Sequence, residues 1–420
     1  MPRTPGQSAT LRERHHRSSR APPHSGRVGR AALASGAALH APECRADAVR
    51  RFAAYDPPEY LDWAPDADEI ARWRDTLHAR PGRAEWIEGR SEADLLGLYR
   101  DLLRTRLLDI ALKRWVRQGV ISKAWLGTGE EAVTVGSVAA LDPARDWVCP
   151  MIRNAGACFM MGMPIADLFR GYLATADGPT GGRDLHVGDI TRRVLQPISH
   201  MGTNVPVMAG VALGLAREGN GGVALTFIGD GATKTGECHE GLTLAAVQNL
   251  PVVFILQDNQ VALGTRASQH GAGRLERWGE MYGLRTVRVD GNHLLDMAAA
   301  TALAVERCRQ EEGPQILHAR TFRMGGHATH DEREARETFS AELFRIWGRR
   351  DPVGLFETYL REEGVDESRL GEIEDEVSAE VDAAAESALA SRDDLPKPES
   401  ALYPGFSTGG VLTGLDSRPV

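Results

Sequence analysis

Two oxygen-bearing side chains follow two apolar segments at a spacing typical of a ligand site in an α/β protein. Asp230 stands between Gly229 and Gly231 after the apolar run 224–228, and Asn259 comes 29 residues later, after the run 252–256. Such runs are typical of buried parallel strands, and residues 237–249 between them predict the crossover helix. Because carboxyl ends of neighbouring parallel strands share one sheet edge, we expect Asp230 and Asn259 to lie together there.

This pair of side chains suits a divalent cation that holds a diphosphate. Carboxylate and amide oxygens are hard ligands of the kind that Mg²⁺ prefers, and Mg²⁺ commonly binds substrate phosphates as well. Gly229 and Gly231 would let phosphate oxygens approach the backbone where a helix begins. The sequence therefore predicts a Mg²⁺–diphosphate site, whereas a Gly-Asp-Gly tripeptide without Asn259 and the two flanking strands would favour an ordinary turn.

Strands and helices alternate along the rest of the chain. Ser91 and Asp94 form an N-cap pattern before a helix that is predicted to run to about Gln118. The other expected elements are a helix after Gly129, a short strand over 147–153, a loop over 176–198, a helix over 205–216 packed closely at Gly210 and Gly214, strands over 286–289 and 315–319, and a helix over 294–308. This alternation predicts an α/β fold with a doubly wound, mostly parallel sheet.

Composition divides the chain into four predicted parts. Residues 1–50 are rich in Arg, Pro, Ser and Gly, which predicts a disordered basic tail, with an organelle transit peptide as the alternative. Residues 51–90 are rich in Pro, Asp and Trp and are expected to form an irregular N-terminal arm. Residues 91–337 would form the ligand-binding α/β domain, and residues 338–420 a C-terminal helical extension and tail.

Overall composition favours an ordinary soluble protein. The net charge of −9 argues against a general nucleic-acid binder, and no apolar run approaches the roughly 18 residues that a membrane span needs. The five cysteines are scattered, which fits a reduced cytoplasmic interior better than a disulfide framework. We therefore expect a cytoplasmic protein without nucleic-acid or membrane partners, or an organelle-matrix protein if residues 1–50 are a transit peptide. Cys238, beside the predicted site, is either a reactive thiol or a small buried hydrophobic residue.

Several further segments occur in an order that resembles a known family. They are Gly129-Glu130-Glu131-Ala132, Arg153-Asn154-Ala155-Gly156, Gly182-Arg183-Asp184-Leu185-His186, Thr203-Asn204-Val205-Pro206, Val289-Asp290-Gly291-Asn292 and the loop 323–331. Together with Asp230 and Asn259, they make residues 95–389 similar to the alpha subunit of the thiamine-diphosphate-dependent decarboxylating component of 2-oxo acid dehydrogenase complexes. The resemblance implies the thiamine-diphosphate-binding fold for residues 91–337.

The resemblance also implies roles for individual residues. Mg²⁺ would be bound by side-chain oxygens of Asp230 and Asn259 and by the backbone carbonyl of Val261. His327 would contact the diphosphate and handle protons of the substrate or of acyl transfer. The remaining cofactor contacts would come from Gly229, Gly231, Ala232 and Arg153 at the diphosphate, and from Ser199 and Met201 beside the aminopyrimidine ring.

The resemblance implies that the chain contributes only half of the active site. In the family, the glutamate that activates the pyrimidine comes from a separate beta subunit, and no second pyrimidine-binding domain is recognisable in this chain. The implied partners are that beta subunit in an α2β2 heterotetramer, a lipoyl acyltransferase core, and a small 2-oxo acid. The alternatives are an acetoin dehydrogenase alpha subunit, a transketolase-type half enzyme and a non-catalytic scaffold subunit. Glu131 as the activating glutamate is a further alternative, although the family position is mainly structural.

Several positions depart from the family pattern or leave choices open. Ile152 replaces a tyrosine beside the phosphate arginine, and Asp258 replaces the first of two asparagines. Ala328 stands where regulatory kinases modify a serine in animal members, and Ala335-Arg336-Glu337 replaces an expected tyrosine–arginine pair. Ala155 and the segment 327–331 slightly favour branched-chain 2-oxo acids over pyruvate. His186 and His330 are either substrate-binding residues or solvated loop residues.

Overall fold

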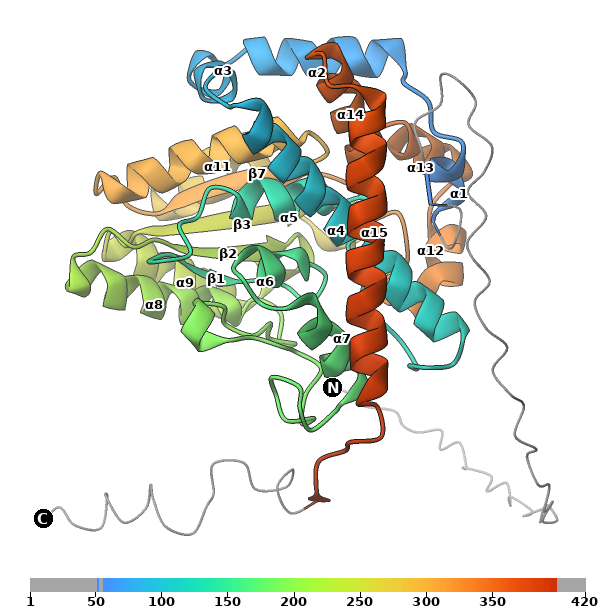
Figure 1. Ribbon diagram of the computed structural model, residues 1–420. Coiled ribbons are helices and arrows are strands. Elements are labelled where there is room, and N and C mark those ends of the chain that lie inside the picture. Colours follow the sequence, from blue (N-terminus) through green and yellow to red (C-terminus); the bar gives the residue numbers. More distant parts are fainter. Residues whose placement is uncertain (1–50, 53–55, 399–420) are drawn as a thin grey trace, which may run out of the picture. The chain divides into compact units, whose positions relative to one another are not determined.

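A parallel sheet of five strands organises the part of the chain that the computed structural model describes, residues 51–52 and 56–398 (Figure 1). The strands, in spatial order, are β1 (Trp147–Cys149), β2 (Ala224–Gly229), β3 (Val252–Asp258), β7 (Gln315–Arg320) and β6 (Thr286–Asp290). Every pair of neighbours is parallel. The predicted α/β fold with a parallel sheet is therefore confirmed.

Helices cover both faces of this sheet, as a doubly wound arrangement requires. On one face, α8 (Asn204–Glu218) and α9 (Gly236–Val247) pack residues such as Met208 and Leu242 against the strands. On the other face lie α4 (Glu92–Arg117), α5 (Glu131–Val138) and α11 (Leu294–Arg309), and Figure 1 shows α8 and α11 on opposite sides of the strands. The central strands β2 and β3 are almost fully buried, which explains their continuous apolar sequences.

The other helices of the described residues are shorter or lie in the terminal regions. They are α1 (Pro58–Leu61), α2 (Ala67–His78), α3 (Pro81–Glu88), α6 (Gly156–Met160), α7 (Ile165–Leu173), α10 (Ala267–His270), α12 (Glu332–Thr338), α13 (Ala341–Gly348), α14 (Pro352–Glu362) and α15 (Glu367–Ala390). A small antiparallel pair, β4 (Val261–Ala262) and β5 (Thr265–Arg266), and four 3₁₀ turns, η1 (Ile190–Arg192), η2 (Gly231–Lys234), η3 (Leu275–Tyr282) and η4 (Thr329–Asp331), complete the elements. None of the helices described is long and apolar enough to cross a membrane.

The N-terminal arm is helical, so the prediction of an irregular segment over 51–90 is wrong. Asp66 accepts hydrogen bonds from the first turn of α2, and Pro81 occupies the start of α3. Both residue types favour helix starts, although their abundance here suggested irregular structure. Trp73 and Ile87 are buried against the main core and thereby hold the two helices in place. The predicted basic tail over 1–50 and residues 399–420 lie outside the described residues. The expected location, in the cytoplasm or in an organelle matrix, therefore stays a prediction.

Two local predictions also differ from the structure. The strand expected over 147–153 ends at Cys149, four residues before Arg153. The helix expected over 205–216 forms, but Gly210 and Gly214 are exposed, and a Cβ atom built at either glycine would have no other atom within 4 Å. These two glycines therefore face outward among the described residues and do not make the close packing that was predicted, whereas Ala209 and Ala212 of the same helix are buried.

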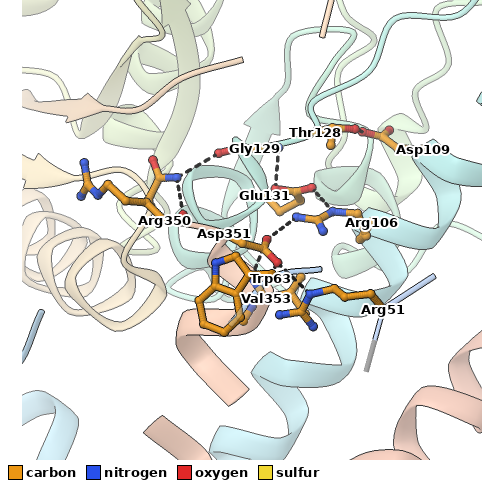
Figure 2. A network of polar contacts seen from close by, with 12 residues as sticks. Arg51, Trp63, Arg106, Asp109, Thr128, Gly129, Glu131, Arg350, Asp351 and Val353 are labelled. Carbon is orange, nitrogen blue, oxygen red and sulfur yellow. Dashed lines mark hydrogen bonds and ion pairs between the residues drawn. The ribbon is translucent and has the colours of Figure 1, made fainter. Parts of the chain in front are cut away.

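A buried ionic network joins the arm, α4, α5 and α14 (Figure 2). The Arg106 guanidinium donates to Glu131 Oε1 at 2.5 Å and to Asp351 Oδ1 at 2.8 Å, and all three side chains are at most 2% exposed. Arg51 lies 3.3 Å from the second oxygen of Asp351, and Glu131 accepts the Gly129 N–H at 2.9 Å. Although burial alone would raise the pKa of Asp351, Arg106 and Arg51 hold it below its usual value.

Removal of Arg106 should therefore destabilise the protein strongly. Arg106→Met leaves Glu131 and Asp351 buried with one cation fewer between them, so we expect a loss of about 3–5 kcal/mol in the free energy of unfolding. Arg100→Met is the matched control, because Arg100 on the same helix pairs with Glu376 at the surface and should contribute less than about 1 kcal/mol. Urea denaturation of the two variants would measure both values, and equal losses would contradict the structural role of the network.

Candidate functional site

One cavity of about 290 Å³ lies at the carboxyl ends of β2 and β3, and it brings together the ten residues that the sequence predicted. Its wall also contains Trp125, Ile152, Ile198 and Leu263, which give it an apolar side. The register of β2 and β3 places Gly229 opposite Gln257, so the residues that follow each strand emerge side by side. The ten predicted residues on its wall are Arg153, Ser199, Met201, Gly229, Asp230, Gly231, Ala232, Asn259, Val261 and His327.

Asp230 carries an unsatisfied carboxylate oxygen. Its Oδ1 accepts the Gly231 N–H at 2.9 Å, whereas its buried Oδ2 has no hydrogen-bond partner among the described residues. The nearest cationic candidate is His270 Nε2 on α10, 3.5 Å away. Burial and the nearby Asp258 carboxylate raise the pKa of Asp230. Because a buried carboxylate without a partner is costly, a cation at Oδ2 would stabilise this arrangement.

Asn259 is held in one orientation by Glu130. The Asn259 Nδ2 donates to Glu130 Oε1 at 3.0 Å, and its Oδ1 accepts the Val261 N–H at 3.3 Å. A carboxylate only accepts hydrogen bonds, so the amide nitrogen must face Glu130 and the amide oxygen must face away from it. Asn259 is thus set to offer an oxygen to a ligand in the cavity.

Glu130 is a buried site residue whose role the sequence did not indicate. It also accepts from Gln257 Nε2 at 2.5 Å, and Gln257 in turn accepts from Asn154 at 3.0 Å. The adjacent Glu131 faces the Arg106 network, so the two acids at the start of α5 point to different sites. The only sequence signal was the tandem pair itself, and the hydrogen-bond partners of Glu130, Gln257 and Asn259, are more than 100 residues away along the chain.

The donor set matches a cation that shares its coordination with a bound anion. Among residues 51–52 and 56–398, no three His, Cys, Asp or Glu side chains gather as metal ligands. The predicted set needs only the carboxylate of Asp230, the amide oxygen of Asn259 and a backbone carbonyl at Val261. These oxygens suit Mg²⁺, which typically takes few ligands from the protein and the rest from phosphate and water.

Arg153 brings positive charge to the wall of this cavity. Arg153 Nη2 lies 3.4 Å from His327 Nδ1, and Arg153 Nη1 lies 3.5 Å from Glu130 Oε2. The buried Nε and Nη1 atoms of Arg153 have no hydrogen-bond partner in the described part of the chain. Arg323 lies close enough that burial and the charge of Arg153 lower its pKa to about 10. Guanidinium groups with unused donors are suited to a phosphate or carboxylate ligand.

His327 is neutral at physiological pH. Burial, together with the charges of Arg153 and Arg323, lowers its pKa to about 4. Since a guanidinium only donates, the contact from Arg153 makes Nδ1 of His327 an acceptor and leaves the ring proton on Nε2. The imidazole can therefore donate from Nε2 without carrying a positive charge.

The structure separates the two histidines that the sequence left undecided. His186 lines the cavity, where its Nδ1 lies 2.7 Å from Asp184 and its Nε2 lies 3.0 Å from Ser199 Oγ. His330 is 58% exposed, pairs with Asp331 and does not line the cavity. Of the two, His186 is therefore placed to act at the site.

The departures from the family pattern have local explanations. Asp258 Oδ2 is hydrogen-bonded to His318 at 2.9 Å, which offsets part of its charge near the cavity. Arg336 forms a two-pronged pair with Glu59 at 2.6 and 3.0 Å, so it joins the C-terminal helices to the N-terminal arm. Ala328 is buried.

Cys238 is fully buried, and burial raises its pKa to about 12, which contradicts the alternative of a reactive thiol.

Comparison with known proteins places the chain in a family. The sequence profile of the family "Dehydrogenase E1 component" matches residues 99–398. The chain is 31% identical over 320 residues to the 2-oxoisovalerate dehydrogenase subunit alpha of Bacillus subtilis, with 75% of this chain and 96% of that protein covered. It is 33% identical over 283 residues to the 3-methyl-2-oxobutanoate dehydrogenase subunit alpha of Mycobacterium tuberculosis, with 67% and 74% covered.

A similar match is found with a pyruvate enzyme. The pyruvate dehydrogenase E1 component subunit alpha of Acholeplasma laidlawii is 31% identical over 292 residues, with 68% of this chain and 81% of that protein covered. A chain with a parallel α/β sheet and a cavity at its strand ends is thus similar in sequence to alpha subunits of 2-oxo acid dehydrogenases. The chain belongs to the dehydrogenase E1 component family, as an alpha subunit of a 2-oxo acid dehydrogenase.

The pKa of His327 can be tested directly. In the full chain we expect NMR titration to give a midpoint near 4, because burial and Arg153 disfavour the imidazolium ion. Arg153→Gln removes one of these charges and should raise the midpoint by about one unit or less. Arg333→Gln, which changes an arginine that is 89% exposed, should leave it unchanged. A midpoint above 6 in the wild-type chain would refute the neutral, donor-ready form of His327.

Proposed function

We propose that this alpha subunit binds thiamine diphosphate and Mg²⁺, takes part in the decarboxylation of a 2-oxo acid, and delivers the acyl group to a lipoyl acyltransferase. The observation that carries the proposal is the buried Oδ2 of Asp230, which has no hydrogen-bond partner among the described residues, beside the oriented amide of Asn259. A carboxylate and an amide oxygen at adjacent strand ends form half of a cation site, and a diphosphate would supply further oxygens.

The lining residues fit the predicted cofactor contacts. Asp230, Asn259 and the Val261 carbonyl would hold Mg²⁺, while the Gly231 and Ala232 N–H groups and Arg153 would bind the diphosphate. Gly229 leaves space, since a Cβ atom there would have only the Met151 sulfur, at 3.8 Å, within 4 Å. Ser199 and Met201 would lie against the aminopyrimidine ring. When bound, thiamine diphosphate supplies an electron sink for the carbanion that decarboxylation creates.

The protein contributes orientation, charge and a proton donor. Arg153 would add a charge-assisted hydrogen bond to the diphosphate, for which it has unused donors. The neutral His327 would donate its Nε2 proton to a substrate oxygen. The apolar wall of Trp125, Ile152 and Ile198 would exclude water from the reacting centre.

The site also supports the proposal of a beta-subunit partner. Asp230 is the only carboxylate among the described residues that line the cavity, so the glutamate needed beside the pyrimidine must come from elsewhere. Met201 and Leu263, which are 59% and 60% exposed, add apolar surface at the same cavity. Exposed apolar side chains around a binding cavity are typical of an interface. We therefore propose an α2β2 heterotetramer that docks on a lipoyl acyltransferase core.

We infer a branched-chain 2-oxo acid as the substrate, ahead of pyruvate. Ile152 and Leu263 add aliphatic surface to the cavity wall, which would favour a branched acyl chain by burial of its methyl groups. The names of the relatives include both substrate types. The preference for a branched-chain acid over pyruvate therefore rests on this wall, on Ala155 and on the segment 327–331, which resembles the loop of branched-chain enzymes.

The proposal is tested by activity of the assembled enzyme. The chain is co-expressed with the beta subunit encoded nearest to it and supplied with thiamine diphosphate, Mg²⁺, an artificial electron acceptor and a panel of 2-oxo acids. We expect CO₂ release, fastest with branched-chain acids, and none from the alpha chain alone because it lacks the activating glutamate. Release of CO₂ from none of the acids would refute the catalytic proposal in favour of a scaffold subunit. Release of CO₂ by the alpha chain alone would refute the proposal that this chain holds only half of the active site.

A further inference from the structure

A second and larger cavity, of about 530 Å³, lies between the start of α3, the edge strand β6 and α11. It shares no lining residue with the strand-end cavity. No acidic residue lines it, although the chain as a whole carries a net charge of −9. Five arginines line it, Arg80, Arg83, Arg285, Arg288 and Arg307. We call this region the arginine groove.

Contacts within the protein neutralise only part of this charge. Arg83 is 4% exposed and is paired with Asp296, and Arg307 lies 3.9 Å from Glu312. No hydrogen bond or ion pair joins the guanidinium groups of Arg285 and Arg288 to any other residue that the structure describes.

Arg83 is affected by the like charges of its neighbours in the groove. Burial lowers the pKa of Arg83, and the neighbouring charges of Arg80 and Arg285 lower it further, against the opposing effect of Asp296. Like charges held near one another repel, and an anion between them would remove this repulsion. The groove is therefore better suited to a bound anion than to water alone.

The start of α3 adds a second feature that favours an anion. Residues 79–83 line the groove, and the helix begins there with Arg80 at the N-cap and Pro81 in the first turn. The Arg80 side chain makes no capping hydrogen bond to the helix. The positive end of the helix thus has no side-chain acceptor of its own. Pro81 has no N–H, and the Arg83 N–H donates to the Arg80 carbonyl at 2.9 Å, so Gly82 is the residue of this first turn that can offer a backbone N–H to a phosphate group.

Apart from Thr286 and Gln315, the remaining surface of the groove is apolar. Ala300, Leu303 and Ala304 of α11 form it together with Val287 of β6 and Leu317 of β7. A volume of several hundred Å³ with one apolar side and a few charged groups is typical of sites for small organic ligands. Inorganic anions alone would leave this apolar surface uncovered.

We propose that the arginine groove binds a small organic anion with two or more phosphate groups. Its phosphates would lie against Arg285, Arg288, Arg307 and the start of α3, and its organic part would cover Leu303 and its neighbours. An extended peptide added to the edge of β6 fits less well, because Arg80 and Arg83 already donate to the Arg288 carbonyl, at 2.5 and 3.0 Å. Edge carbonyls occupied in this way cannot pair with another strand.

Calorimetric titration of the full chain with ADP, inorganic pyrophosphate and adenosine tests the proposal. EDTA is added so that Mg²⁺-dependent binding at the strand-end cavity does not contribute. We expect ADP to bind more tightly than pyrophosphate, and adenosine to bind least, because both the charge and the apolar surface contribute. Arg285→Glu/Arg288→Glu should weaken ADP binding at least about tenfold, the effect of losing one charge-assisted contact.

Two further variants separate the groove from general charge effects. Arg345→Glu/Arg369→Glu makes the same charge change at exposed residues of α13 and α15 and should leave ADP affinity unchanged. Arg307→Gln, a milder change, should weaken binding about threefold or more and serves if the double variant does not fold. Equal ADP affinity in wild type and groove variants, or no ADP binding at all, would overturn the proposal. Neither result depends on thiamine diphosphate binding or on decarboxylase activity.

Discussion

Parallel pairing of β2 and β3 is the constraint on which the rest of the site depends. Their register brings Asp230 and Asn259 to one edge of the sheet, because the two strands pair with each other from Ala224 opposite Val252 to Gly229 opposite Gln257 and are almost fully buried. A shift of one residue in this register would turn the side chains of one strand to the opposite face and would displace the two ligands from each other. The apolar sequences of these strands therefore determine the geometry of the site as well as the stability of the core.

A second layer of buried polar groups turns this placement into a defined chemical site. Glu130 orients the amide of Asn259, and the adjacent Glu131 is fixed by Arg106, which also holds Asp351 at the start of α14. The start of α5 is thus held from both sides, by the site and by the network that reaches the N-terminal arm. Substitutions at distant residues of that network should therefore alter the geometry of the site through the start of α5.

The sequence predicted the parts of the protein that local patterns determine. Apolar runs identified β2 and β3, and the capping pair Ser91 and Asp94 identified the start of α4, where the structure has the predicted capping box. All ten predicted site residues line one cavity. They could be predicted because some of them directly follow the predicted strands and the others belong to segments that resemble a family. Glu130 was missed because its role depends on contacts with residues far along the chain. The helical arm over 58–88 was mispredicted because its Asp and Pro residues, which also favour helix starts, were interpreted as a sign of irregular structure. The exposure of Gly210 and Gly214 was mispredicted because tertiary packing decides which face of a helix is buried.

The central claim is that Asp230 and Asn259 form the protein half of a cation site at the strand ends. Its most direct test is Mn²⁺ binding, with Mn²⁺ in place of Mg²⁺, to the assembled enzyme with thiamine diphosphate, followed by electron paramagnetic resonance. The account predicts that Asp230→Ala abolishes Mn²⁺ binding and that Glu130→Gln, which disturbs the orientation of Asn259, weakens it by about 10- to 100-fold. Mn²⁺ affinity in Asp230→Ala equal to that of the wild type would contradict the account.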